Sequence, residues 1–113
     1  MEDCIFCKIA NREIGSLIYE NDYVVAFDDL NPQAPVHTLI VPKKHITNIE
    51  KLQEEDFNYV IEIHKVIQKV AKMKNVNETG YRIISNCGKD AGQTVMHLHY
   101  HLLAGKELGD KIV

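Results

Sequence analysis

Three histidines alternate with apolar residues near the end of the chain, in the run His97-Leu98-His99-Tyr100-His101-Leu102-Leu103. On an extended strand, alternate side chains share a face and lie about 6.5–7 Å apart, so the imidazoles would line one face and the apolar side chains a core. Imidazole can act at neutral pH as a nucleophile, an acid, a base or a metal ligand. The alternative is a solvated polar face, but such a face more often uses Lys, Glu, Thr or Ser. The run therefore predicts a reactive site.

Two cysteines near the N-terminus, Cys4 and Cys7, have the spacing of a metal clip. A thioredoxin-like redox pair would follow a strand, and only three residues precede Cys4, so the redox interpretation is disfavoured. A zinc clip needs two further ligands from elsewhere in the chain. Cys87 makes the cysteine count odd, at three, which argues against a disulfide framework. Two packed free thiols remain the alternative for the pair, and Cys87 is expected to be an ordinary loop or core residue.

A glycine-containing turn, Gly92-Gln93-Thr94, directly precedes the histidine run. Backbone N–H groups in such a turn can form a nest for an anion, and the side chains of Gln93 and Thr94 can add donors. The turn is not a phosphate loop of the Walker type, because Gly88-Lys89 lacks the Gly-x-x-x-x-Gly-Lys-[Ser/Thr] pattern. An oxyanion is therefore expected beside the histidines, with a plain surface turn as the alternative.

Two helices and five strands are expected to position these residues. The predicted helices cover residues 5–12 and 53–73, and the predicted strands cover residues 17–20, 23–27, 37–41, 80–85 and 95–103. Two prolines make residues 31–35 a loop, and residues 86–94 form a second loop. The order of short helix, strands, long helix and strands predicts an α+β fold with a largely antiparallel sheet.

The long helix carries an unusually wide apolar surface. Its predicted core-facing side chains are Phe57, Val60, Ile61, His64, Ile67 and Ala71, widened by Ile63, Val66 and Val70. Such a width predicts contact both with the sheet and with a second subunit.

Composition restricts the partners of the protein. The 113 residues are expected to form one domain, residues 1–113. Thirteen Lys and Arg against sixteen Asp and Glu leave a net charge of −3, which argues against a nucleic-acid partner but leaves room for a small anionic ligand. The N-terminus lacks the basic region of a signal peptide, and no apolar run approaches the roughly 18 residues of a membrane span. We therefore expect a cytoplasmic protein with no membrane partner.

The histidine run, together with the segments at residues 4–9, 27–37, 41–45 and 90–94, resembles the histidine triad (HIT) family in its nucleotide-binding (Hint) branch. The resemblance covers nearly the whole chain. It implies a five-stranded sheet with one long and one short helix, and a two-fold homodimer with a continuous ten-stranded sheet. It also implies hydrolysis of purine nucleoside 5′-phosphoramidates to a nucleoside monophosphate and an amine, through a nucleotidyl-histidine intermediate.

The resemblance assigns roles residue by residue. The middle histidine of the triad, His99, would attack the α-phosphorus, His101 would bind the phosphate or protonate the leaving group, and His37 would complete the proton network. Asp29 would accept the ribose hydroxyls and Asn86 would touch ribose or phosphate, beside the turn Gly92-Gln93-Thr94. The apolar clamp around the base would comprise Ile5, Phe6, Ile9, Phe27, Leu30 and Leu39, each of which would otherwise be ordinary core.

The resemblance also suggests a structural zinc ion held by Cys4, Cys7, His45 and His97. This assignment separates His97 from His99, although the two share a strand parity. The sequence departs from the family pattern in two places. Thr94 stands where serine is common, and the tail at residues 104–113 lacks the Trp-Pro-Pro ending of some relatives, which leaves the amine specificity open.

Three other functions are compatible with these motifs. A zinc hydrolase could use His97, His99 and His101 as a catalytic metal site, but it would leave the cysteine pair unexplained. A nucleotide-binding regulatory module would keep the pocket with weak catalysis. A dinucleoside polyphosphate hydrolase would share the triad, and diadenosine triphosphate as substrate would identify it.

Overall fold

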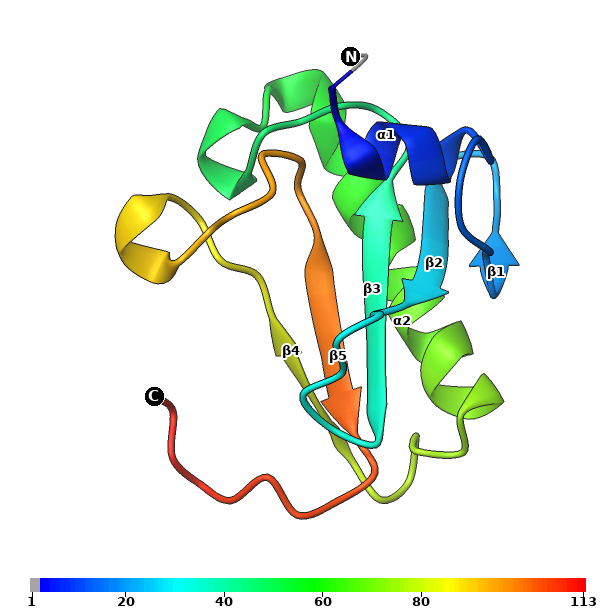
Figure 1. Cartoon of the computed structure of the whole chain (residues 1–113), viewed down its shortest axis with the longest axis vertical. Helices are drawn as coiled ribbons and strands as arrows, with labels where there is room; N and C mark the ends of the chain where they lie inside the picture. The colour runs from blue at the N-terminus through cyan, green and yellow to red at the C-terminus, as the bar shows by residue number, and fades with distance from the viewer. Residues whose placement is uncertain (1–2) are drawn as a thin grey trace.

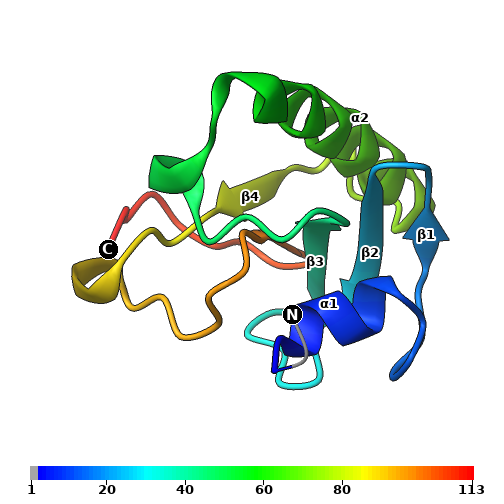
Figure 2. The same ribbon diagram turned by 90° about the horizontal axis from the view of Figure 1, so that it is seen from above.

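A computed structural model describes residues 3–113 of the chain. Two α-helices, α1 (Ile5–Ala10) and α2 (Phe57–Met73), lie on opposite faces of one sheet (Figures 1 and 2). Its strands are β1 (Tyr19–Glu20), β2 (Val24–Asp28), β3 (Val36–Pro42), β4 (Tyr81–Ile84) and β5 (Tyr100–Ala104). They are antiparallel throughout, in the spatial order β1-β2-β3-β5-β4. The prediction of an α+β fold with a five-stranded antiparallel sheet and one long helix is confirmed.

Three short 3₁₀ turns complete the fold: η1 (Ile49–Lys51), η2 (Glu54–Asp56) and η3 (Lys89–Ala91). The predicted long helix begins with η2 and becomes α-helical only at Phe57, because a capping box closes its start. In that box the N–H of Gln53 donates to the carboxylate of Asp56 at 2.9 Å. Within residues 3–113, neither helix combines the length and the apolar character that a bilayer crossing requires.

Each face of the sheet has its own apolar core. On the α2 side the core includes Leu98, Tyr100 and Leu102, as the alternation in the histidine run predicts. The smaller core on the α1 side contains Phe6, Ala10, Val25, Phe27, Leu39 and Val41. The candidate site lies on the α1 side of the sheet and packs against this second core.

The predicted core face of α2 was partly wrong. The buried side chains are Ile63, Val66, Ile67, Val70 and Ala71. Phe57 and Ile61, which the periodicity placed in the core, are 49% and 54% exposed. Two adjacent stripes of this helix are apolar, and only packing against the sheet decides which of them is buried.

The last strand begins five residues later than predicted, at Tyr100. Its partner β3 ends at Pro42, which has no N–H to offer the ladder. The carbonyl of Pro42 instead accepts from Nε2 of His97 at 2.8 Å, and the N–H of Leu98 donates to the carbonyl of Ile46 at 2.6 Å. His97 and His99 therefore lie in irregular backbone that leads into the sheet, whereas His101 lies within β5.

Candidate active site and metal cluster

A line of hydrogen bonds joins β3 to β5 through two histidines. The backbone N–H of Gln33 donates to Nδ1 of His37 at 3.0 Å, so this nitrogen is the acceptor. The proton of neutral His37 is then on Nε2, which lies 2.8 Å from Nδ1 of His101. His101 consequently carries its own proton on Nε2, the far side of its ring. The backbone N–H of Gln33 thus sets the tautomer of His101 through His37. Nothing in the sequence at Gln33 indicated this role.

His99 has the opposite tautomer. Its Nδ1 donates to the backbone carbonyl of His97 at 2.7 Å, so Nε2 keeps its lone pair. The side chain is buried, and the ring of Phe6 packs edge-on against it with centroids 4.9 Å apart. The rings of His99 and His101 are neighbours, with centroids 5.1 Å apart. An unprotonated nitrogen and a protonated one therefore stand side by side.

Burial keeps these imidazoles neutral. It lowers the pKa of His99, and it lowers the pKa of His101 to about 4, helped by the neighbouring His99 and His37. The carboxylate of Asp29 opposes the shift in both residues. Neutral His99 is the form that can act as a nucleophile.

The second cluster brings together Cys4, Cys7, His45 and His97, whose ligand atoms all lie within 4.8 Å of one another. The Nδ1 atom of His97 lies 3.2 Å from Sγ of Cys4 and 3.4 Å from Sγ of Cys7, and Nδ1 of His45 lies 3.3 Å from Sγ of Cys7. Burial lowers the pKa of His97 to about 4 and raises the pKa of Cys7 to about 11, the latter with a contribution from Cys4. The bond from His97 Nε2 to Pro42 leaves Nδ1 as the lone pair that faces the sulfurs. This set could hold a metal ion.

His97 and His99 are two residues apart in the irregular backbone before β5, but their side chains belong to different clusters. The ring of Phe6 packs edge-on against both, at 6.2 Å from His97 and 4.9 Å from His99. His97 is turned toward the cysteines and His99 toward His101. The ring of Phe6, which comes from α1, packs against both imidazoles. Two histidines that alternate along one segment can therefore belong to two sites.

A cavity of about 630 Å³ lies between α1, the end of β2 and the segment before His97. No histidine lines it, but two of its lining residues reach the histidines, since Phe6 packs against His99 and Asp29 lies 3.5 Å from His37. Its lining includes most of the predicted nucleoside residues: Ile5, Phe6, Ile9, Phe27, Asp29, Leu30, Leu39 and Thr94. Leu30 is 95% exposed, so it forms a rim rather than a wall. Val95 also lines the cavity, and its position next to Thr94 was the signal that could have identified it.

The two adjacent aspartates point in different directions. Asp28 accepts from the hydroxyl of Thr38 at 2.9 Å and pairs with Lys74 at 3.0 Å. Asp29 caps the following turn by accepting from the N–H of Asn31 at 2.8 Å, and its other oxygen lies 3.5 Å from Nε2 of His37. Asp29 is therefore the carboxylate close to both the cavity and the histidines, because adjacent residues of an extended segment point in opposite directions.

The loop before the histidine segment differs from its prediction at Gln93. The amide of Asn86 donates to the carbonyl of Ala91 at 2.8 Å, so it braces the loop. The amide of Gln93 was expected to add donors for the phosphate, and that expectation was wrong. Gln93 is buried, and its Nε2 donates to the carbonyls of Thr47 and Val95 at 2.8 and 3.0 Å. Both N–H bonds of the amide are thereby used within the fold.

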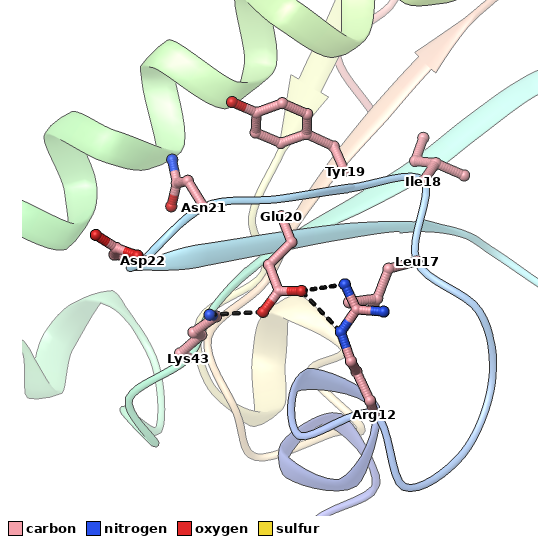
Figure 3. Close-up of a pocket in the computed structure, with 8 residues that line it drawn as sticks. All are labelled: Arg12, Leu17, Ile18, Tyr19, Glu20, Asn21, Asp22 and Lys43. Carbon is pink, nitrogen blue, oxygen red and sulfur yellow. Dashed lines mark hydrogen bonds and ion pairs between the residues drawn. The ribbon is translucent and has the colours of Figure 1, made fainter.

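A separate hollow lies at β1, away from these residues. Figure 3 shows Glu20 there between Arg12 and Lys43, with Nζ of Lys43 2.6 Å from the carboxylate. These two partners lower the pKa of Glu20, Lys43 contributing most. Glu20 pairs with both cations at the surface, and no residue predicted to do chemistry lines the hollow.

Comparison with known proteins agrees with this arrangement. The purine nucleoside phosphoramidase of Escherichia coli strain K12 is 41% identical over 109 residues, which cover 96% of this chain and 92% of that protein. A HIT family hydrolase from Clostridium thermocellum has a TM-score of 0.96 and 51% identity, and covers 100% of this chain and 99% of that chain. A histidine triad protein from Clostridium difficile has a TM-score of 0.94 and 54% identity, over 98% and 97% of the two chains. The family model described as HIT domain matches residues 11–108, a span that includes His37, His99 and His101, and the chain belongs to the HIT family.

Proposed function

We propose that the protein is a nucleotide hydrolase that cleaves purine nucleoside 5′-phosphoramidates to a nucleoside monophosphate and an amine. The observation that carries this proposal is the pairing of complementary tautomers beside a nucleoside-sized cavity. His99 presents a lone pair at Nε2, and His101 presents a proton at Nε2. The phosphoramidase relative in Escherichia coli supports the same substrate class.

The proposed reaction has two steps. In the first, Nε2 of His99 attacks the α-phosphorus while the P–N bond to the amine breaks, and His101 gives the leaving nitrogen a proton from Nε2. The negative charges of the phosphate and Asp29 favour the protonated form of His101 in the complex, because nearby opposite charge raises a histidine pKa. In the second, water attacks the phosphorus, returns a proton to His101 and releases His99. Splitting the displacement in this way replaces one difficult step with two easier ones.

The cavity explains how a nucleotide would be oriented for this attack. Apolar side chains of α1 and β2, such as Phe6 and Phe27, would hold the base. Asp29 has two acceptor oxygens, which suits a pair of ribose hydroxyls. The N–H groups of Gly92 and Gln93 donate within the loop, so the backbone N–H of Thr94 would be the one that faces the phosphate. Placing the reacting atoms in this way lowers the barrier without further chemistry.

We also propose that the four-residue cluster binds zinc with a structural role. Zinc bonds of about 2.3 Å to sulfur and 2.0 Å to nitrogen place the corners of a tetrahedron about 3.5 Å apart. The observed sulfur–nitrogen distances of 3.2, 3.3 and 3.4 Å fit that tetrahedron. Two cysteines and two histidines make a closed ligand set, so the ion would hold α1 against the histidine segment and take no part in the reaction. The bond from His97 to Pro42 is the outer contact that orients such a ligand.

A homodimer is the third part of the proposal. An apolar hollow lies between α2 and β4, lined by Val60, Ile61, His64, Lys65, Ile67, Gln68, Tyr81 and Ile83. Ile61 and Tyr81 are 54% and 36% exposed, and β4 is an open edge of the sheet. A second copy would cover this surface and extend the sheet. Sedimentation at micromolar concentration tests this, because a species of 12.9 kDa would contradict it.

The function is tested with adenosine 5′-phosphoramidate and diadenosine triphosphate as parallel substrates, followed by chromatography of released AMP. Faster turnover of the phosphoramidate is expected. Preference for the dinucleotide would instead identify a dinucleoside polyphosphate hydrolase. Binding of AMP without turnover of either substrate would identify a regulatory module. Zinc analysis of the same preparation accompanies the assay.

A further inference from the structure

Gln93 lies between two residues expected to face the phosphate, yet its side chain is turned into the protein. It is only 7% exposed. Its Oε1 accepts from the N–H of Gly88 at 2.9 Å and from the amide of Asn48 at 3.1 Å, while its Nε2 donates to Thr47 and Val95. Two donors and two acceptor positions are thus all used. Such complete pairing in a buried amide rigidifies the segments that it joins.

The partner amide, Asn48, comes from a segment that the sequence did not single out. It is 9% exposed, and its Nδ2 makes the bond to Gln93. Its Oδ1 is buried without a hydrogen-bond partner among residues 3–113. A buried acceptor without a partner lowers the stability of the fold, so stability alone would favour an apolar side chain here. A buried polar group that costs stability points to a function of its bond to Gln93.

The amide pair closes the loop that precedes the histidines. The N–H of Gln93 donates to the carbonyl of Gly88 at 3.1 Å, while the side chain of Gln93 accepts from the N–H of the same glycine. Two glycines of this loop, Gly88 and Gly92, have φ values of +87° and +82°, which only glycine adopts readily. The loop at residues 88–93 is therefore closed by Gln93, whose backbone N–H and side chain both bond to Gly88.

The same pair attaches this loop to the segment that follows β3. Residues 45–48 run alongside residues 93–98, with bonds from Gln93 to Thr47 and from Leu98 to Ile46. Figure 1 shows the loop with η3 beside the stretch that leads to α2. Within the loop, the N–H of Gly92 donates to the carbonyl of Lys89 at 3.0 Å and the N–H of Gln93 donates to Gly88, so of residues 92–94 only Thr94 keeps a backbone N–H without a partner among residues 3–113.

We propose that Asn48 and Gln93 form a buried positioning pair that shapes the backbone of residues 88–94 to receive the phosphate of the substrate. This inference rests on the proposed function, because it specifies how the same site binds phosphate. Neither side chain touches the substrate. The pair acts through the backbone N–H of Thr94, which directly follows the loop that the pair holds in place, and this makes it distinct from the histidines.

The test separates phosphate binding from nucleoside binding. The variant Asn48→Leu keeps the number of side-chain heavy atoms, removes the donor to Gln93 and also removes the unpartnered acceptor. Calorimetric titration with AMP and with adenosine is expected to show AMP affinity reduced about tenfold or more, with adenosine affinity within about twofold of the original protein. The kcat for adenosine 5′-phosphoramidate is expected to fall about 10- to 100-fold, as for other small displacements of a reacting group. The unfolding midpoint should stay within a few degrees.

Two further variants complete the design. Asn48→Ser retains a donor and is expected to recover part of the AMP affinity and of kcat, which also covers the case in which Asn48→Leu fails to fold. Asn77→Ser, at an exposed position between α2 and β4, is the matched control and should bind AMP normally. If Asn48→Leu and Asn48→Ser lose AMP and adenosine equally, or lose neither, the positioning pair is refuted. If the original protein itself binds AMP no better than adenosine and releases no AMP, the proposed function fails instead.

Discussion

The backbone carbonyl of His97 accepts the Nδ1 proton of His99 at 2.7 Å. The residue expected to hold a metal thereby sets the tautomer of the residue expected to attack phosphorus. The side chain of His97 is in turn fixed by Pro42 at 2.8 Å and faces the sulfurs of Cys4 and Cys7. The two clusters therefore share one short segment of backbone, and each of the following predictions depends on how that segment is held.

Replacement of the proposed nucleophile should abolish turnover without emptying the cavity. In His99 the carbonyl of His97 holds the proton on Nδ1, which leaves the Nε2 lone pair free to attack. Because His99→Ala removes this nucleophile, kcat should fall about 10³-fold or more. AMP affinity should change by only a few-fold, because the apolar lining and Asp29 remain. Single-turnover assays and calorimetry measure the two quantities. An active His99→Ala protein would place the nucleophile elsewhere.

Removal of the metal should weaken nucleoside binding as well as stability. The helix α1 carries Cys4 at its N-cap and Cys7 within it, and the same helix presents Ile5, Phe6 and Ile9 to the cavity. Chelation should therefore lower the unfolding midpoint by several degrees and reduce adenosine affinity, since binding energy at a metal site is coupled to folding. Binding of adenosine should reciprocally slow the loss of zinc to a chromogenic chelator.

The variant Cys7→Ser should have the same effect as chelation, with zinc content below one per chain. Cys87→Ser is the matched control, because Cys87 lies in the loop before η3, away from the four-residue cluster. An unchanged kcat at saturating substrate is the expected result in the chelated, folded protein. Loss of chemistry in step with zinc, while the fold and nucleoside binding persist, would instead support the catalytic zinc hydrolase.

Asp29 should decide between ribose and deoxyribose. A bond from a hydroxyl to a carboxylate contributes about 1.5–3 kcal/mol, so Asp29→Asn should reduce kcat/KM for the ribonucleotide substrate about 10- to 100-fold. The corresponding 2′-deoxy substrate should lose much less. Asp28→Asn is the comparison, because Asp28 bonds Thr38 and Lys74 and should leave the ribose preference unchanged. Equal losses for both sugars in Asp29→Asn would show that the carboxylate acts only through His37.

The stability of the fold should rise with pH between about 4 and 6.5. Burial and the neighbours His99 and His37 lower the pKa of His101 to about 4, while Asp29 raises it. The unfolded chain has an ordinary histidine near 6.5 and therefore binds more protons in this interval. Stability is thus complete above the unfolded pKa and is lost as the pH falls toward 4. Urea unfolding at pH 7 and pH 5 measures the difference, and His101→Gln should reduce it. An unchanged difference in His101→Gln would assign the effect to other groups.

Several features could be predicted from residue types and spacing alone. Alternation in the run at residues 97–103 placed Leu98, Tyr100 and Leu102 in the core beneath α2, as observed. Extended backbone separated Asp28 from Asp29. Local patterns determine these features, because the period of a strand or helix decides which neighbours share a face. The antiparallel sheet and the long helix followed from the same patterns.

Other features required the folded chain. Periodicity could not tell which stripe of α2 is buried, because both stripes consist mainly of apolar side chains. The start of β5 depended on Pro42, a residue 58 positions earlier than Tyr100, whose missing N–H ends the ladder. Gln93 was assigned to the phosphate from its position in the turn, but its direction was set by carbonyls at Thr47 and Val95.

The roles of the three histidines also depend partly on the sequence and partly on the tertiary structure. The sequence by itself determined that a cysteine pair, a glycine-containing turn and a run of imidazoles follow one another in this order, because residue type and local spacing are properties of the chain. The family resemblance suggested that His97 joins the cysteines, and only the tertiary structure shows which contacts turn it there while His99 faces His101. That choice depends on the Pro42 carbonyl, the ring of Phe6 and the Gln33 N–H, all of which reach the histidines from segments distant in sequence. Such long-range contacts set tautomers and side-chain directions, and a linear pattern contains no information about them.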